Sequence, residues 1–379
     1  MKSNILSLAE RVIRRNDRAH PADDLLRLEL KNQSGLSPEQ AAEISHSVFS
    51  YFRWRGWLEE RHQISDQIAH AVGLAAEFAK HAETFSDWEL THRVAPGWAS
   101  DEIQMTPEFA RVLQAEPKLW LRARPGQGKF VSQRLRHCRA FGEGPLSDTL
   151  EYQGREDLFR TAEFHAGNFE LQDISSQAVG LVCAPEHGEC WWDACAGEGG
   201  KLLHLSDLMK NKGLIWGTDR AEWRLRRLKR RAARAKIFNY RTAIWDGRAK
   251  LPTKTIFDGV LVDAPCSGSG TWQRNPHTRW TLTPGDLKEL YGLQIQLLAR
   301  AAAGVKPGGK LVYSVCSLAR SETQKVVEHF ESAGLPFTPV PLINPLTPET
   351  TTTTTRLVLW PQQFGGNGMF IAAWLRSPL

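Results

Sequence analysis

Apolar residues recur at intervals of three and four positions through residues 1 to about 90. They do so at Ile5–Leu8, Val12–Ile13, Leu25–Leu30 and Ala41–Tyr51. A period near 3.6 residues is typical of amphipathic helices, so we expect a mainly helical region here. Ser37 precedes Pro38 and lies three residues before Gln40, which predicts a capped helix start.

The pattern changes between residue 105 and about residue 170. Leu119–Arg124 alternates apolar and polar side chains and ends at a Pro-Gly pair, as a strand followed by a turn does. Lys129–Cys138 has a helical pattern, and shorter strand-like runs follow it. We therefore expect a small α+β region in this part of the chain.

From about residue 175 onward, short apolar strands alternate with glycine-rich turns and helical stretches. Strands are expected at 191–193, 213–219, 257–263 and 310–315. This alternation predicts an α/β domain with a mostly parallel sheet that has helices on both faces. Ligands of such sheets bind beyond the carboxyl ends of the strands. The threonine-rich run at 350–355 is expected to be a surface loop.

A chain of 379 residues is expected to contain two or three domains. The patterns place a helical domain at 1–100, a small α+β region at 101–170 and an α/β domain at 171–379. The chain contains no apolar run long enough to cross a membrane. Its basic, amphipathic N-terminus lacks the apolar core of a secretory signal, and Glu10 and Asp17 disfavour a transit peptide.

The six cysteines form neither a CxxC pair nor a cluster with zinc-ligand spacing. We therefore expect no metal site, and free thiols in a reducing cytoplasm.

The formal net charge is only +6, but the basic residues are unevenly placed. Two groups that would suit an RNA-binding surface stand out, although solvated helix faces are the alternative for both. The first mixes arginines with aromatic residues in the helical region: Arg14, Arg15, Arg18, Phe52, Arg53, Trp54, Arg55, Trp57 and Arg61. The second lies on one expected helix: Arg224, Arg226, Arg227, Lys229, Arg230, Arg231, Arg234 and Lys236.

A glycine-rich turn, Gly197–Gly200, follows the expected strand that ends at Asp193. Glycines in such a turn let the backbone approach a ligand closely. Asp219 ends the next strand, where a carboxylate can accept hydrogen bonds from both hydroxyls of a ribose. Asp246 follows the third strand and either accepts a hydrogen bond from an adenine amino group or is a turn residue. Together these features predict a nucleoside-containing cofactor, which a dehydrogenase would also bind.

Two cysteines directly follow expected strands: Cys266 ends the run DAPC and Cys316 ends the run YSVC. Two thiols beside a nucleoside cofactor are a more specific signal than one, since a single buried cysteine is usually a small core residue. The run Thr271–Pro276, with Arg279 and Trp280, could grip a base extruded from its stack. Core packing is the alternative for the tryptophans.

These stretches resemble signature blocks of the Sun-type (Fmu) RNA (cytosine-5-)-methyltransferases, which include proteins like ribosomal RNA small subunit methyltransferase B. The blocks are Asp193–Lys201, Asp263–Gly270 and Ser314–Ser317. The resemblance extends to Gly167–Gln177, Lys306–Gly309, and weakly Pro361 and Gly368–Ala372, and so covers roughly residues 165–379. The helical N-terminal region is faintly similar to the NusB-like RNA-binding domain that some members carry.

The resemblance implies a Rossmann-like S-adenosylmethionine-dependent methyltransferase domain that makes 5-methylcytosine in RNA through a covalent cysteine–cytosine adduct. It implies Cys316 as the nucleophile, Cys266 as the group that assists product release, Asp263 as the acid that holds the cytosine edge, and Lys201 as its organiser. S-adenosylmethionine is the implied cofactor. Its implied binding residues are Cys195, Ala196, Gly197, Glu198, Gly199, Gly200, Lys201, Asp219, Arg224, Asp246 and Asp263.

The chain departs from the family pattern at several positions without losing a thiol. Glu198 stands where the family usually has proline, and its carboxylate could pair with a cationic group of the cofactor or face solvent. Leu202, Thr323, Asn367 and Met369 also replace the usual residues.

The implied partner is RNA, either ribosomal or transfer RNA, with no membrane partner and a monomeric protein. One alternative is a non-catalytic RNA-binding assembly factor with the same fold, but the intact lysine, aspartate and two cysteines argue against it. A nucleotide-dependent oxidoreductase would explain Asp219 but would leave the two cysteine loops unexplained.

Overall fold

The structure is a computed structural model that describes residues 3–33, 35–248, 250–347 and 349–378. The chain forms two compact units whose segments alternate along the sequence. The first unit comprises the residues up to Pro117, Ser267–Leu287 and Trp360–Gly365; the second comprises Lys118–Cys266, Lys288–Leu359 and the residues from Gly366 on. In the described ranges, no helix combines the length and the apolar character that a membrane span requires.

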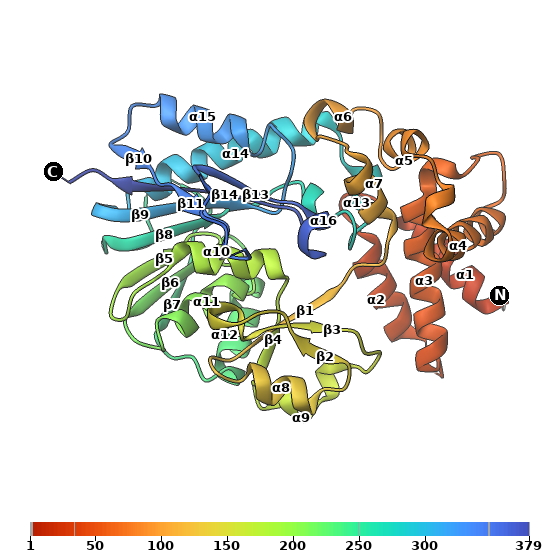
Figure 1. The fold of residues 1–379 in the computed structure, drawn as a ribbon, viewed down its shortest axis with the longest axis horizontal. Coiled ribbons are helices and arrows are strands. Elements are labelled where there is room, and N and C mark those ends of the chain that lie inside the picture. The colour runs from red at the N-terminus through yellow and green to blue at the C-terminus, as the bar shows by residue number, and fades with distance from the viewer. Residues whose placement is uncertain (1–2, 34, 249, 348, 379) are drawn as a thin grey trace. The chain divides into compact units, whose positions relative to one another are not determined.

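The first unit is mainly helical (Figure 1). Leu8, Val12 and Val48 meet in its buried core, which confirms the apolar faces expected from the sequence. The predicted capped start is also confirmed, because Ser37 and Gln40 exchange side-chain and backbone hydrogen bonds in a capping box. The helices are α1 (Ser3–Arg15), α2 (Ala22–Asn32), α3 (Pro38–Trp54), α4 (Ile64–Lys80), α5 (Asp87–Arg93), α6 (Ala99–Glu102), α7 (Pro107–Gln114), α13 (Thr278–Thr281) and α16 (Pro361–Phe364).

The second unit is built around a large, mostly parallel sheet, as the sequence predicted. Its parallel strands lie in the order β7-β6-β5-β8-β9, so the chain order reverses direction between β5 and β8. They are β5 (Cys190–Asp193), β6 (Leu214–Asp219), β7 (Tyr240–Ile244), β8 (Phe257–Asp263) and β9 (Val305–Val315). The strand β14 (Met369–Arg376) pairs antiparallel with β9, and β10 (Phe337–Pro339) and β13 (Arg356–Leu359) pair antiparallel with β14.

Helices cover both faces of this sheet (Figure 1). One face packs against α14 (Pro284–Ala302) and α15 (Gln324–Ser332), through a core that includes Trp192, Tyr313 and Leu298. The other face carries α10 (Ile174–Cys183), α11 (Gly200–Leu208) and α12 (Glu222–Arg234).

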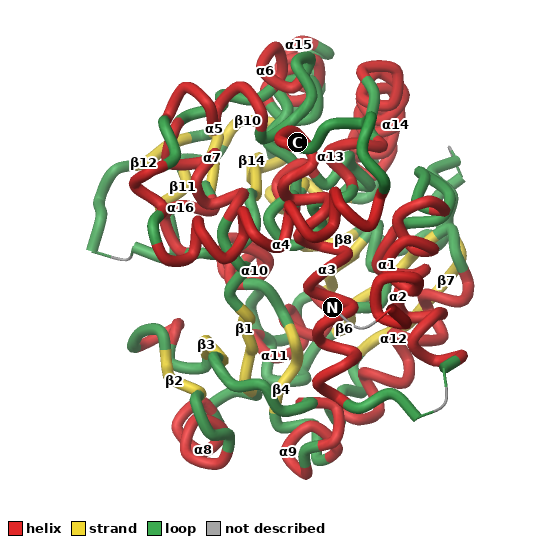
Figure 2. The backbone as a smooth tube through the Cα atoms, turned by 90° about the vertical axis from the view of Figure 1, so that its right-hand side faces the viewer, coloured by secondary structure: helices red, strands yellow, loops and turns green. Residues whose placement is uncertain are grey.

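A small antiparallel sheet in the order β2-β3-β1-β4 also belongs to the second unit, with α8 and α9 beside it (Figure 2). Its elements are β1 (Leu119–Ala123), α8 (Gly128–Arg134), β2 (Cys138–Ala140), β3 (Thr149–Tyr152), α9 (Ala162–His165) and β4 (Phe169–Leu171). The helix expected up to Cys138 ends at Arg134, because His137 adopts a left-handed φ of 59° and β2 begins at Cys138. The threonine run expected to be a loop contributes β12 (Thr353–Thr354), which pairs with β11 (Leu342–Ile343).

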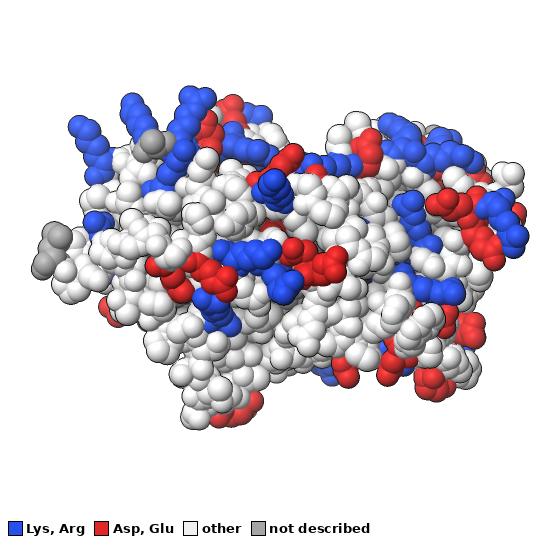
Figure 3. All heavy atoms as spheres, turned by 90° about the horizontal axis from the view of Figure 1, so that it is seen from above, with Lys and Arg blue, Asp and Glu red and all other residues white. Residues whose placement is uncertain are grey.

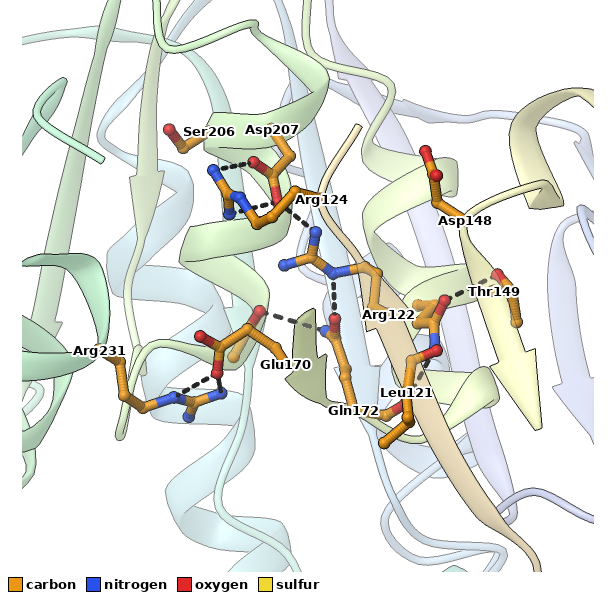
Figure 4. Close-up of polar contacts among 12 residues, drawn as sticks. Leu121, Arg122, Arg124, Asp148, Thr149, Glu170, Gln172, Ser206, Asp207 and Arg231 are labelled. Atoms are coloured by element: carbon orange, nitrogen blue, oxygen red, sulfur yellow. Dashed lines mark hydrogen bonds and ion pairs between the residues drawn. The ribbon is translucent and has the colours of Figure 1, made fainter. Parts of the chain in front are cut away.

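Polar side chains of the small sheet hold both ends of α11 (Figure 4). At the last turn of the helix, Arg122 and Arg124 form ion pairs with Asp207. At the first turn, Gln172 donates a hydrogen bond to the carbonyl of Gly200 at 3.1 Å. The Nε of Arg122 donates to the side-chain oxygen of Gln172 at 2.5 Å, so the two anchors form one connected network.

A second anchor joins the small sheet to α12. The carboxylate of Glu170, which is almost fully buried, accepts hydrogen bonds from Arg231 and Arg234. Arg231 also donates to the backbone carbonyl of Glu198 at 3.0 Å. Glu198 and Gly200 lie in the glycine-rich turn, so the small sheet fixes this turn from two sides.

Candidate active site

The loop between β5 and α11 contains the predicted glycine-rich turn. Gly197 and Gly199 have φ angles of 54° and 87°, which fall in the left-handed region that favours glycine. A Cβ atom on Gly199 would lie 2.6 Å from the side chain of Leu228 in α12. The turn can therefore pack closely against α12 only because glycine occupies this position.

A cavity of about 410 Å³ lies at the carboxyl ends of β5, β6 and β8. It is located where the strand order of the sheet reverses, which is the position at which α/β sheets bind ligands. The structure brings all the predicted cofactor-binding residues to the wall of this cavity except Gly199, which packs against α12. The lining residues among them are Cys195, Ala196, Gly197, Glu198, Gly200, Lys201, Asp219, Arg224, Asp246 and Asp263.

Backbone donors hold the carboxylate of Asp219 at the edge of the cavity. Its Oδ2 accepts a hydrogen bond from the N–H of Gly197 at 3.1 Å, and its Oδ1 accepts one from the N–H of Ala221 at 2.8 Å. Asp246 pairs with Arg248 at 2.8 Å and remains 43% exposed. Both acids therefore have a fixed orientation without being closed off from a ligand.

Glu198 has a partner that the sequence did not indicate. Its Oε1 lies 2.5 Å from the Nη1 of Arg227 in α12. The side chain still lines the cavity, but its carboxylate is held by α12.

An apolar wall of the cavity was also not predicted. Trp245, which is only 5% exposed, lines the cavity together with Leu293 and Leu297 of α14. Trp245 directly precedes Asp246 in the sequence, and this proximity was the only available signal. The two leucines have an ordinary helical pattern, and only the fold brings them to the site.

Asp193 is the most unusual side chain in the wall of the cavity. It is 1% exposed, and within the described part of the chain neither carboxylate oxygen has a hydrogen-bond partner of acceptable geometry. Burial raises its pKa to about 8; the carboxylate of Asp263 raises it as well, whereas Lys201 opposes the shift. The backbone N–H of Cys195 opposes the upward shift only in part. A buried carboxylate without a well-formed hydrogen bond beside a cavity suits a cationic ligand, and S-adenosylmethionine carries an ammonium and a sulfonium group. The residues present therefore fit the implied cofactor.

Lys201 and Asp263 form a fixed pair between the cavity and the cysteines. The Nζ of Lys201 donates to Oδ2 of Asp263 at 2.7 Å, and the hydroxyl of Ser314 donates to Oδ1 at 2.8 Å. Burial lowers the pKa of Lys201, but the carboxylate of Asp263 more than offsets this, so the net shift is upward. The lysine therefore stays protonated and keeps the carboxylate in place.

The two cysteines of the predicted site lie next to each other. Cys266 and Cys316 follow the neighbouring parallel strands β8 and β9, and their sulfur atoms are 3.4 Å apart. Asp263 pairs in register with Ser314 across these strands, so the acid and both thiols occupy one edge of the sheet.

Two residues of other elements connect the cysteine loops. Gln294 of α14 donates at 2.9 Å to the carbonyl of Pro265, which precedes Cys266, and also at 2.9 Å to Glu322. The buried carboxylate of Glu322 accepts a hydrogen bond from Ser317, which follows Cys316. Nothing in the sequence distinguished Gln294 as a partner of both loops.

The other four cysteines are in environments that disfavour thiolates. Burial raises the pKa of Cys138 to about 11 and that of Cys183 to about 12. Burial also raises the pKa of Cys190 and Cys195. Because the thiolate is the reactive form, these side chains are poor nucleophiles near neutral pH.

Burial excludes two side chains from the expected grip on an extruded base. Trp272 is fully buried, which is the core-packing alternative given above, and Arg279 is also fully buried, so the expectation for this arginine is wrong. Arg279 instead donates to the backbone carbonyls of Val94, Leu113 and Trp272. The sequence suggested a ligand-binding role because local sequence does not show whether an arginine is buried. Arg279 is buried, and its acceptors are uncharged.

The basic helix is also less available for RNA than its sequence suggests. Four of its arginines form ion pairs within the protein: Arg226 with Glu222, Arg227 with Glu198, and Arg231 and Arg234 with Glu170. Over the face that Figure 3 shows, many Lys and Arg side chains lie beside Asp or Glu side chains. In α12, Lys229 and Arg230 are exposed and have no carboxylate within ion-pair distance among the residues that the structure describes.

Solved structures share this architecture. The crystal structure of PH0851 superposes with a TM-score of 0.78 over 98% of this chain and 97% of that chain, at 23% identity. A methyltransferase homolog protein from Pyrococcus horikoshii superposes with a TM-score of 0.59 over 71% of this chain and 90% of that one, at 26% identity. The fold and the site define a Rossmann-like methyltransferase, for which S-adenosylmethionine is the cofactor.

Sequence comparison narrows this class to one family. Residues 180–375 match the family described as "16S rRNA methyltransferase RsmB/F", and the chain belongs to it. The resemblance to Sun-type enzymes is thereby confirmed. A "Probable ribosomal RNA small subunit methyltransferase B" from Synechocystis sp. is 35% identical over 304 residues, which are 76% of this chain and 66% of that protein. A protein of the same name from Bacillus subtilis is 35% identical over 72% of this chain and 62% of its own length. The aligned regions thus span less than two thirds of these relatives.

Proposed function

We propose that the protein methylates carbon 5 of a cytosine in RNA through a covalent adduct with Cys316. The observation that carries the proposal is the pair of cysteine sulfurs 3.4 Å apart, beside the Lys201–Asp263 pair at the edge of the cofactor cavity. When the accepting atom is already nucleophilic, a methyltransferase needs no covalent bond to its substrate. When a cysteine must first add to the base, a second side chain is useful, because it can help to break the carbon–sulfur bond after methyl transfer.

The cavity residues have complementary roles toward the cofactor. Asp219 would accept hydrogen bonds from ribose hydroxyls, Asp246 would accept one from the adenine amino group, and the carboxylate of Asp193 would offset the positive charge of the cofactor. Bound S-adenosylmethionine supplies an electrophilic methyl group. Trp245 and the leucines of α14 exclude water from the apolar side of the cavity.

The protein side chains make cytosine reactive. The sulfur of Cys316 adds to carbon 6 while its proton passes through Asp263 to ring nitrogen 3, which makes carbon 5 nucleophilic. After carbon 5 has gained the methyl group, the thiolate of Cys266 takes the carbon 5 proton, and the carbon–sulfur bond breaks with its electrons returning to Cys316. Nitrogen 3 then returns its proton to Cys316, and Cys266 gives up the proton that it took, so one proton is released per methyl group transferred and both cysteines regain their starting states.

The substrate that we propose is RNA of the small ribosomal subunit, because the matched family and the similar proteins are named for this RNA. We further propose that residues 1–100 and 101–170 bind RNA and that residues 171–379 carry out catalysis.

The test combines labelled S-adenosylmethionine, unmodified small-subunit ribosomal RNA and nucleoside analysis. The wild-type protein is expected to label 5-methylcytosine, and Cys316→Ala is expected to abolish labelling. Cys266→Ala is expected to accumulate a protein–RNA adduct that survives denaturing electrophoresis. Cys138→Ala, which removes a thiol of the small sheet, is the matched control and should behave as the wild type.

Three results would contradict the proposal. Label in another nucleoside would refute carbon 5 as the acceptor, and label in transfer RNA alone would refute the ribosomal substrate. An adduct that accumulates with Cys316→Ala rather than with Cys266→Ala would reverse the roles of the two thiols.

A further inference from the structure

Two adjoining cavities in the helical unit have no role in the chemistry described above. One has a volume of about 390 Å³ and the other about 520 Å³. Both are within the size range of small-ligand pockets. They share five lining residues: Arg14, Tyr51, Arg55, Ile64 and Trp280. These residues come from α1, α3, the 3-10 turn Arg55–Trp57, α4 and α13. Because the two cavities share them, they form one continuous surface that we call the Arg55 pocket.

The aromatic side of the Arg55 pocket is rigid. The indole N–H of Trp280 donates to the carbonyl of Phe52 at 2.7 Å, which fixes the orientation of the ring. The guanidinium carbon of Arg55 lies 5.6 Å from the centre of this ring. Tyr51 is only 8% exposed and forms part of the floor. An arginine plane over a fixed aromatic ring is an arrangement on which an unpaired base can stack.

The positive charge of the pocket is only partly neutralised. Arg14 contacts Glu10 at 3.8 Å, which is a weak exposed pair. Asp17, the acid nearest to Arg14 in sequence, is bound by the backbone N–H groups of Ala19 and His20. Glu60 also lines the larger cavity, but no carboxylate of the described residues lies within ion-pair distance of Arg55, so the charge of Arg55 is available to a phosphate.

One polar atom in the pocket also lacks a partner. The side-chain oxygen of Asn16 is buried at the wall of the smaller cavity and accepts no hydrogen bond from any residue that the structure describes. Leaving a buried acceptor unpaired is costly. The exocyclic amino group of a base would supply the missing donor.

From this combination we infer that the Arg55 pocket binds one unpaired nucleotide of the RNA substrate, with the base against Trp280 and the phosphate at Arg14 and Arg55. The inference rests on the proposed RNA substrate but adds a subsite remote in sequence from the cofactor loop. Trp280 belongs to the segment Ser267–Leu287, which leaves the second unit directly after Cys266 and packs with the N-terminal helices. A nucleotide in the pocket would therefore contact the same segment that begins at the proposed catalytic cysteine loop.

The experiment compares two double variants of the full chain. Arg14→Gln/Arg55→Gln removes the two arginine charges that line both cavities, whereas Arg11→Gln/Arg27→Gln removes two charges of α1 and α2 that pair with Glu29 and Asp24 and do not line the pocket. The probe is a fluorescent single-stranded oligoribonucleotide, and its dissociation constant is measured by anisotropy over a range of salt concentrations. The pocket variant is expected to bind about tenfold more weakly, with a salt slope smaller by about 0.7 for each lost phosphate contact. The control should change neither quantity to this extent.

A second measurement locates the base. Irradiation of the wild-type protein with an oligoribonucleotide that contains 4-thiouridine is expected to cross-link Trp280 or Tyr51. Equal losses of affinity in the two double variants, or cross-links only outside the pocket, would overturn the inference. If pocket variants bind normally while the wild type forms 5-methylcytosine, the pocket fails and the proposed function stands. If the pocket binds and cross-links RNA but 5-methylcytosine is absent, the proposed function fails and the pocket stands.

Discussion

The buried carboxylate of Asp193 is expected to make cofactor binding depend on pH. Its folded-state pKa is about 8, whereas an aspartate in an unfolded chain titrates near 3.9. Between these values the carboxyl group of the free protein stays protonated and neutral. If the cationic cofactor binds to the form of the protein in which Asp193 is ionised, the carboxyl proton of Asp193 must leave before or during binding.

The magnitude follows from the difference between the pKa and the pH of the experiment. Ionising the group at one pH unit below its pKa requires about 1.4 kcal/mol, which is a factor of ten in the binding constant. The affinity for S-adenosylmethionine should therefore rise about tenfold per pH unit between about pH 5 and pH 7, where the pH lies well below the pKa of Asp193 and both cationic groups of the cofactor remain charged. The Asp193→Asn variant, which has the same size but cannot ionise, should lose this dependence.

Calorimetric titration of the wild type and the variant with S-adenosylmethionine measures the effect directly. S-adenosylhomocysteine, which lacks the sulfonium charge, is expected to show a weaker dependence on pH. A dissociation constant of the wild-type protein that does not change with pH would refute the reasoning, as would an equal slope in Asp193→Asn.

The same group has an opposite effect on the stability of the free protein. Because the folded pKa lies above the unfolded pKa, the folded state binds the extra proton between about pH 4 and pH 8. The stabilisation from protonated Asp193 is complete below this window and is lost at about 1.4 kcal/mol per pH unit as the pH rises through it. Urea unfolding of the free wild type and of Asp193→Asn over this range tests the sign.

Three further predictions concern the elements around the site. Glu170→Gln leaves two partly buried arginines without a carboxylate and should lower the free energy of unfolding by roughly 2–3 kcal/mol, measured as a fall in the urea midpoint. Replacing Lys229 and Arg230 with glutamine should reduce the salt slope of RNA binding. The control Arg226→Gln breaks an exposed ion pair and should leave the slope nearly unchanged. Equal effects of the two changes would mean that α12 does not bind RNA. Gly199→Ala places a Cβ in a left-handed turn against a leucine of α12 and should cost about 2 kcal/mol of stability and weaken cofactor binding, as thermal unfolding and calorimetry would show.

The sequence predicted those parts of the protein that local patterns determine. The strands around Asp193, Asp219 and Asp263 were found because a short apolar run, a turn residue and a helix follow one another. The carboxyl ends of parallel strands meet at one edge, so the placement of the acids around a common cavity followed from the fold class. The proximity of Cys266 and Cys316 follows from the same rule, because β8 and β9 are neighbours in the sheet.

Contacts between distant segments could not be predicted in this way. The pairing of Glu198 with Arg227, the apolar wall from α14 and the double role of Gln294 depend on the positions of side chains from separate elements. The burial of individual side chains could not be predicted either. Arg279 is charged, as most surface residues are, but it binds backbone carbonyls in the interior.

The two compact units are interleaved along the chain. The N-terminal helices are packed together with Ser267–Leu287, a segment that begins one residue after Cys266. Arg279 and Gln273 tie this segment to backbone carbonyls near the end of the helical region. The helical unit is therefore covalently continuous with the cysteine loop at Ser267. The two compact units are thus not consecutive stretches of sequence, because the chain passes from the cysteine loop directly into the helical unit at Ser267.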